Sequence, residues 1–120
     1  MHVHHTPESA AHPGPPTFFV GDVTIQPITS EDGLDIALVR FSAGARTYWH
    51  THESPQVLHC VEGRGILATR DQRSEVGPSD IVHIAPGEEH WHGATPDSHF
   101  THLSIRAMGE TRWTTVDPLG

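Results

Sequence analysis

The sequence predicts an all-β fold with a single core, arranged as a jelly roll. From Phe18 onward, apolar and polar residues alternate with period two, which is typical of half-buried strands. The chain has 120 residues, the size of one domain, and its 11 Gly and 10 Pro mark frequent turns. No segment shows a sustained helical period, and there is no internal repeat. Short strands between closely spaced turns favour a sandwich or barrel.

Each expected strand is a short alternating run bounded by turn residues. The turns are expected at Glu31-Asp32-Gly33, Ala43-Gly44, Glu62-Gly63, Gly77-Pro78, Pro86-Gly87 and Pro96-Asp97. The strands are expected at Val23 to Pro27, Leu34 to Phe41, Thr47 to His52, Gln56 to Val61, Gly65 to Arg70, Asp80 to Ile84, Trp91 to Ala94, Phe100 to Arg106 and Trp113 to Val116.

Composition excludes some classes of partner. The formal net charge is −8, and all seven cationic residues are Arg, so a protein that binds nucleic acid or an anionic membrane is not expected. No stretch is apolar for long enough to span a bilayer. A single cysteine, Cys60, cannot form an internal disulfide, which suits a reducing interior. We therefore expect a cytoplasmic protein.

The first 16 residues differ in composition from the rest. They lack the basic start and apolar run of a secretion signal. We interpret residues 1–16 as a flexible arm and residues 17–120 as the folded domain. The arm's histidines could bind a metal, but a flexible arm must lose entropy to wrap an ion, so the plain arm is preferred. The arm's His and Pro residues are His2, His4, His5, His12, Pro7, Pro13, Pro15 and Pro16.

Three histidines and one glutamine form a candidate metal site. His50 and His52 lie two apart in an expected strand, so their side chains share one face. Gln56 follows after the turn at Pro55, on a face that it shares with Leu58 and Cys60, opposite Val57, His59 and Val61. A second hairpin around Pro86-Gly87 can bring His90 beside the first pair. Three imidazoles and an amide oxygen suit one divalent first-row ion, Mn, Fe, Ni, Co or Zn.

These residues fall on a pattern that resembles the cupin superfamily. The first cupin motif has a Gly, His-x-His, a Glu and a second Gly; Gly44, His50, His52 and Gly63 match it, with Gln56 in the place of the Glu. The second motif is matched by Gly87 and His90, whereas Ser79, Ala85 and Ala94 depart from it in turn positions. The resemblance implies a jelly-roll barrel, a bound metal and a homodimer.

A closer resemblance is to the small manganese-dependent cupin hydroxynitrile lyases, over roughly Pro16 to Val116. This resemblance implies that each chain binds one manganese ion and that residues lining the pocket are catalytic. It is carried by Gly44-Ala45-Arg46-Thr47, Trp49-His50-Thr51-His52, Gln56, Pro86-Gly87-Glu88, His90-Trp91-His92-Gly93-Ala94 and Thr101-His102-Leu103.

The candidate catalytic residues are His92, His102 and Arg46. His92 shares its parity with His90 and is expected to be a pocket acid or base, or else a structural histidine. His102 shares a face with Arg106; that face could point to water, but the resemblance places His102 inward, and period two then places Arg106 inward too. An inward Arg106 would fit a substrate that carries a carboxylate. We expect Cys60 to be a buried hydrophobe, not a nucleophile.

Three functions are compatible with this site. The first is a metal-dependent lyase in which His92 or His102 moves a proton, and the departing anion is stabilised by His102 or Arg46. The second is an oxygen-dependent dioxygenase or decarboxylase. The third is a cupin that binds a small molecule without catalysis. A neutral Gln56 in place of a carboxylate leaves the charge of the ion uncompensated, which strengthens its Lewis acidity and disfavours a trivalent state.

Overall fold

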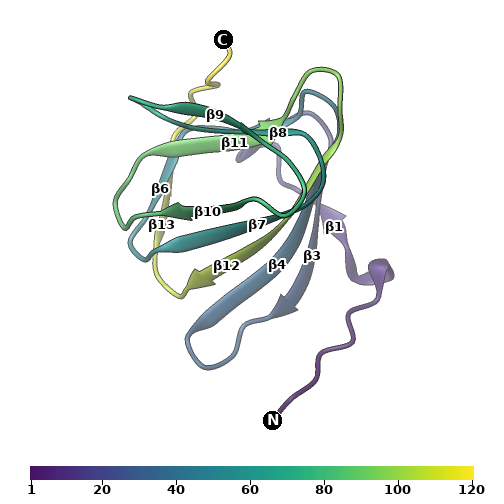
Figure 1. Cartoon of the computed structure of the whole chain (residues 1–120). Helices are drawn as coiled ribbons and strands as arrows, with labels where there is room; N and C mark the ends of the chain where they lie inside the picture. Colours follow the sequence, from purple (N-terminus) through teal and green to yellow (C-terminus); the bar gives the residue numbers. More distant parts are fainter.

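The chain folds into two antiparallel sheets that face each other and enclose the core (Figure 1). The computed structural model describes all residues from Met1 to Gly120. One sheet has the order β1-β3-β4-β12-β7-β10, and the other has the order β13-β6-β11-β5-β2, with β8 beside β11 and β9 beside β8. This arrangement confirms the predicted jelly roll. The elements are η1 (Glu8–Ala10), β1 (His12–Pro13), β2 (Phe19–Val20), β3 (Val23–Thr29), β4 (Leu34–Phe41), β5 (Arg46–Thr47), β6 (His50–His52), β7 (Gln56–Gly63), β8 (Gly65–Thr69), β9 (Arg73–Val76), β10 (Ile81–Ile84), β11 (His90–Ala94), β12 (Phe100–Ala107) and β13 (Thr111–Trp113).

The core lies between the sheets because strand residues alternate between inside and outside. On β7, Gln56, Leu58 and Cys60 are buried, whereas Val57 is half-buried and His59 is exposed. The predicted facing of this strand is therefore confirmed. Deeper in the barrel, the core is built on large side chains with almost no exposed surface, among them Phe41, Leu58 and Phe100.

The observed strands differ from the expected ones in several places. The run expected from Thr47 to His52 is split into β5 and β6, because the backbone N–H groups of Tyr48 and Trp49 bond to Phe18 and Val116 outside these strands. The strand β9 was also not expected from the sequence, because it is largely polar. It pairs with β8 alone and so needs no continuous apolar face. The strand at the end of the chain lies earlier than expected, at Thr111–Trp113.

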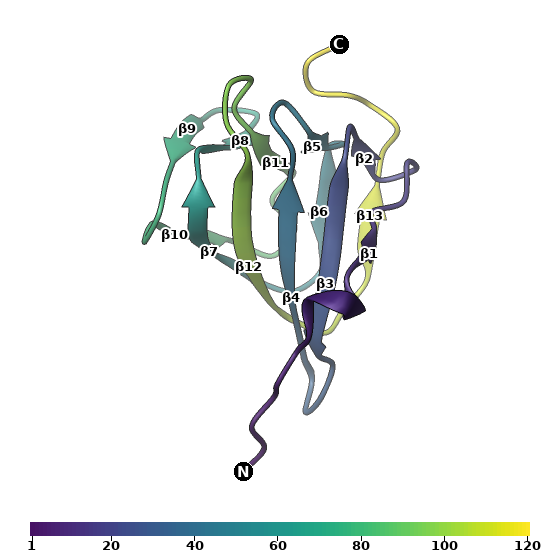
Figure 2. The ribbon, with the colours of Figure 1, turned by 90° about the vertical axis from the view of Figure 1, so that its right-hand side faces the viewer.

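Part of the N-terminal arm packs on the barrel. His12 and Pro13 form β1 and pair with Ile25 and Thr24 of β3, as Figure 2 shows along the outer side of that strand. The side-chain amide of Gln26 also donates to the carbonyl oxygen of Thr6 at 3.0 Å. The first paired strand thus lies before the expected boundary at residue 16, while the flexibility of the arm stays a prediction. The one helical segment, η1, has three residues, and no helix of this chain could cross a membrane.

Gly63 and Gly44 give a matched test of how closely the backbone packs at the end of β7. Both have a positive φ of 75°, but a Cβ at Gly63 would overlap the carbonyl oxygen of His99, whereas a Cβ at Gly44 would meet nothing within 4 Å. Gly44→Ala should lower the free energy of unfolding by about 1–2 kcal/mol for the left-handed backbone alone. Gly63→Ala should lower it by a further ~1–3 kcal/mol, the usual effect of overpacking. Urea unfolding measures both, and equal losses would contradict this account of the turn.

Candidate metal centre

His50, His52 and His90 converge inside the barrel. The strands β6 and β11 pair with His50 directly opposite His90, and the two ring centroids are 4.2 Å apart. His52, two residues along β6, lies on the same face, with its ring centroid 5.3 Å from that of His90. The ligand atoms of all three lie within 4.8 Å of one another, and the three residues are at most 7% exposed. The structure therefore brings together the three histidines that the sequence indicated.

Gln56 reaches the same place from the facing sheet. It begins β7, and its side-chain amide donates from Nε2 to Oγ of Ser104 on the neighbouring β12 at 3.0 Å. This bond uses the amide nitrogen and fixes the orientation of the side chain. The remaining oxygen, Oε1, is buried and accepts no hydrogen bond. The site thus has an unpaired amide oxygen beside its imidazoles.

Hydrogen bonds at Nδ1 set the tautomers of His50 and His90. Nδ1 of His50 lies 2.9 Å from the carbonyl oxygen of Tyr48, and Nδ1 of His90 lies 2.8 Å from that of Glu88. A carbonyl only accepts, so both rings carry their proton on Nδ1 and present a lone pair at Nε2. Nδ1 of His52 lies 2.8 Å from Oγ1 of Thr111, which can donate or accept, and 3.3 Å from Nη1 of Arg106, which only donates. Such outer contacts orient metal-binding imidazoles in proteins.

The donor set fits a divalent transition metal. Nε2 of His52, Nε2 of His90 and Oε1 of Gln56 are buried without any hydrogen-bond partner, and buried polar atoms are rarely left so. Burial lowers the pKa of His50 and His90, and it lowers that of His52 to about 4. All three imidazoles are therefore neutral near pH 7, the form that binds metals. A divalent ion would satisfy the unpaired atoms, whereas a proton would charge a buried ring.

A cavity of about 220 Å³ opens onto this centre from between the two sheets. His50, His52 and Gln56 lie on its wall together with His92 and His102. Part of the wall is apolar or aromatic, from Phe19, Ile25, Ala37, Val39 and Trp113. A small molecule with an apolar group can therefore sit beside the metal-binding atoms.

His92 and His102 form a buried pair in this cavity. Nε2 of His102 lies 3.1 Å from Nδ1 of His92, and the two residues are 0% and 5% exposed respectively. Burial lowers the pKa of His92 well below its usual value, with a further contribution from His102, and it lowers the pKa of His102 to about 3. Both rings are neutral near pH 7. Because His92 uses Nδ1 for the pair, its Nε2 is the atom that remains for a substrate.

Arg106 also faces the cavity, from β12. Its guanidinium donates to Oδ2 of Asp35 at 2.7 Å and to the hydroxyl of Thr111, which is also the contact of His52. Asp35 lines the cavity as well. The charge of Arg106 is thus compensated by a carboxylate in the same wall.

Arg46 and Cys60 are not among the residues that line the cavity. The guanidinium of Arg46 donates to Oδ1 of Asp117 at 2.7 Å and to the carbonyl oxygen of Gly44 at 2.9 Å. This ion pair raises the pKa of Arg46 and lowers that of Asp117. Cys60 lies in the apolar core, where burial raises the pKa of its thiol to about 11. Of the candidate catalytic residues, only His92 and His102 lie at the site.

Trp113 and Thr111 were missed as site residues. The indole of Trp113 stacks on His50, with ring centroids 4.3 Å apart and an angle of 25° between the planes. The hydroxyl of Thr111 contacts Nδ1 of His52, as described above. Neither residue has a ligand type or a spacing that would single it out in the sequence. Both reach the site because β13 pairs with β6, Trp113 opposite His50 and Thr111 opposite His52.

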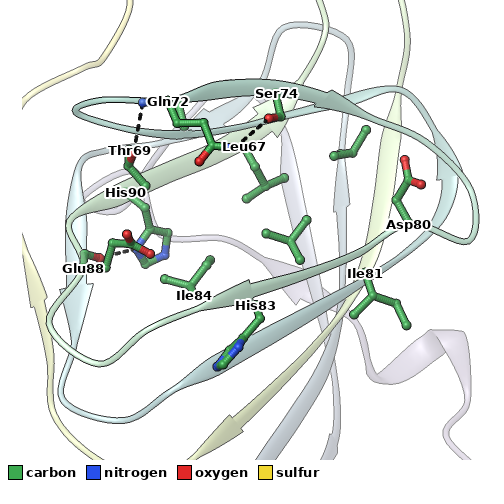
Figure 3. A pocket seen from close by; sticks show the side chains of 13 residues that line it. Leu67, Thr69, Gln72, Ser74, Asp80, Ile81, His83, Ile84, Glu88 and His90 are labelled. Carbon is green, nitrogen blue, oxygen red and sulfur yellow. Dashed lines mark hydrogen bonds between the residues drawn. The ribbon is translucent and has the colours of Figure 1, made fainter.

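A second, larger cavity of about 380 Å³ lies between β8, β9 and β10 (Figure 3). His90 and Glu88 lie at one end of it, and Asp80 and Ile81 lie at the other. Among the four metal-binding candidates, only His90 touches this cavity. The smaller cavity therefore carries the candidate chemistry.

Comparison with known proteins assigns the family. Residues 37–106 match the family described as the cupin domain. The chain belongs to the cupins. This cupin is 39% identical over 111 residues to an (R)-mandelonitrile lyase from Granulicella tundricola, covering 88% of this chain and 84% of that protein.

Solved structures agree with this assignment. A cupin-like protein from Thermotoga maritima is similar to the cupin with a TM-score of 0.82 and 31% identity, covering 85% of this chain and 83% of that one. A cupin 2 conserved barrel domain protein from Rhodopseudomonas palustris has a TM-score of 0.80 at 17% identity, covering 98% and 90% respectively. The second likeness shows the fold alone.

Proposed function

We propose that this cupin is a metal-dependent lyase of the hydroxynitrile lyase type, which cleaves a small cyanohydrin to an aldehyde or ketone and hydrogen cyanide. The observation that carries the proposal is the neutral His92–His102 pair, which lines the same cavity as His50 and His52 of the three-histidine centre. The likeness to a protein named (R)-mandelonitrile lyase supports the same reaction class. We propose one ion per chain, held by His50, His52, His90 and Gln56, with manganese preferred over iron, nickel, cobalt or zinc.

The chain's own residues supply binding and proton transfer. A divalent ion at the centre supplies Lewis acidity toward the substrate hydroxyl. The apolar wall formed by Phe19, Val39 and Trp113 holds the organic group of the substrate. Nε2 of His92 accepts the hydroxyl proton, while Nδ1–H of His92 donates to Nε2 of His102 and keeps the ring in the correct tautomer.

Bond cleavage then completes the reaction. As the hydroxyl proton moves to His92, the carbon–cyanide bond breaks, and its electron pair leaves with the cyanide. The oxygen becomes the carbonyl of the product. Burial makes a charged His92 unfavourable, so the ring returns its proton to cyanide, and neutral hydrogen cyanide leaves. The protonation state of the protein is the same before and after each cycle.

Arg106 supports a second candidate, an oxygen-dependent dioxygenase or decarboxylase that acts on a carboxylate. Arg106 is the cation in the cavity wall and could pair with a substrate carboxylate. Its pairing with Asp35 weakens this alternative, because a substrate anion would have to displace that contact. Neutral Gln56 also disfavours oxidation of the metal. An assay without oxygen separates the candidates, since the lyase keeps its activity.

Substitution of His92 tests the proposed lyase. His92→Ala should lower turnover of a cyanohydrin panel by roughly a hundredfold to ten-thousandfold, the range for a lost acid or base group, and leave metal content intact. Gln56→Glu should keep the metal and lower turnover, because added negative charge weakens the Lewis acidity of the centre. His99→Ala, which changes an exposed histidine outside the cavity, is the control. Wild-type turnover in His92→Ala, or an absolute requirement for oxygen, would overturn the mechanism.

We also propose that the enzyme is a cytoplasmic homodimer. The apolar side chains of Leu38, Leu103 and Ile105 are half-buried on the outer face of the six-stranded sheet, which contains β4, β12 and β7. Val57 continues this patch opposite Ile105. A second copy would cover these side chains, and contiguous apolar surface of this kind is typical of interaction sites. The lone buried Cys60 suits a reducing compartment.

Light scattering at micromolar concentration tests the dimer. The wild type should have the mass of two chains. Leu103→Glu should give monomers, because a carboxylate would be buried without a partner. Val116→Glu, at an exposed position outside the patch, should leave the dimer unchanged. A monomeric wild type would contradict the proposal.

A further inference from the structure

A second group of metal-binding side chains lies outside the barrel, at the start of the chain. Nδ1 of His2 is 2.9 Å from Oε1 of Glu31, and Nε2 of His4 is 3.4 Å from the same oxygen. The three ligand atoms lie within 4.8 Å of one another. None of these residues lines the cavity of the metal centre. The group is therefore independent of the proposed lyase site.

Two features bring the arm to Glu31. The arm is anchored a few residues further on, where Gln26 donates to both the carbonyl oxygen and the hydroxyl of Thr6, and where β1 pairs with β3. Glu31 lies in the turn between β3 and β4, and Thr29 donates to its carboxylate at 3.3 Å. Figure 2 shows that this turn and the start of the chain lie at the same end of the molecule. A segment that is already anchored loses less conformational entropy on binding an ion than a free arm does. The anchored arm therefore has a smaller entropy cost of metal binding than the flexible arm expected from the sequence.

The spacing of the atoms suits a tetrahedral ion. Zinc binds imidazole nitrogen and carboxylate oxygen at about 2.0–2.2 Å, so two ligands on a tetrahedron lie about 3.3–3.6 Å apart. The 3.4 Å between His4 and Glu31 falls in this range. The 2.9 Å between His2 and Glu31 is a hydrogen bond, which an ion can replace with a small movement of an exposed ring; the His2 side chain is 63% exposed. Water can complete the coordination.

We propose that His2, His4 and Glu31 form an accessory surface site for a divalent transition ion of the zinc class. The bound ion fastens residues 2–6 of the arm to the β3–β4 turn. Two imidazoles and one carboxylate are a borderline donor set that favours zinc, copper or nickel over magnesium or calcium. Because the site is largely exposed and two of its three ligands are on the arm, it exchanges its ion with solution, unlike the buried centre.

Zinc equilibrium dialysis of the full-length protein, with the buried centre loaded, tests this proposal. The wild type should hold one more zinc equivalent per chain than Glu31→Gln or the double variant His2→Ala with His4→Ala. Even the loss of an outer contact weakens metal sites roughly tenfold to a hundredfold, so loss of a ligand should weaken binding at least about tenfold. His5→Ala is the matched control, since His5 is on the same arm but outside the group.

Hydrogen exchange gives a second readout that arm-only binding would not produce. Zinc should slow amide exchange in residues 2–6 of the wild type and of His5→Ala, and should have no such effect in Glu31→Gln. Equal zinc content in the wild type and Glu31→Gln would overturn the proposal, whether neither binds the extra ion or both bind it through the arm alone. A loss in His5→Ala as large as in the double variant would also overturn it.

Discussion

The pairing of β6 with β11, with His50 opposite His90, is the constraint on which the site depends. It joins two segments that are far apart in the sequence and fixes the distance between their imidazoles. His52 follows because it shares a face with His50, and Gln56 is supplied by the facing sheet. The centre thus bridges both walls of the barrel. A metal there would link the sheets that enclose the core.

The same arrangement buries many polar atoms in the interior of the barrel. His50, His52, His90, His92 and His102 are all buried and all have a lowered pKa, so the folded barrel holds neutral imidazoles in an apolar shell. The Nδ1 atoms of the three metal-binding candidates have partners, but the unpaired atoms point inward. A bound ion removes that unfavourable burial, so metal binding and folding should be coupled. The His92–His102 pair is the part of this interior that is left for chemistry.

Period-two reasoning predicted most of this site because it applies wherever a strand is uninterrupted. It gave the inward facing of Gln56 on β7 and, once the resemblance had placed His102 inward, that of Arg106 on β12. It fails at Arg46, because unbroken alternation back from His50 would place Arg46 inside. The irregular residues Tyr48 and Trp49 shift the phase by one, so Thr47 lines the cavity and Arg46 pairs with Asp117 outside it.

Contacts between distant segments could not be predicted from the sequence. Trp113 and Thr111 belong to the site through the pairing of β13 with β6, which no spacing encodes. The arm is a similar case: its composition predicts flexibility, but it packs on β3 through the amide of Gln26, a contact visible only in three dimensions. The buried position of Gln26, at 4% exposed, had no signal in its residue type.

The metal content of purified protein, after dialysis against metal-free buffer, tests the central claim most directly. The account predicts one tightly held divalent transition ion per chain in the wild type and in the exposed control His83→Ala. It predicts loss of that ion in His50→Ala and in His90→Ala, with circular dichroism showing that the strands persist. Metal retained in His50→Ala or His90→Ala, but lost on removal of residues 1–16, would contradict the account and place the ion on the arm.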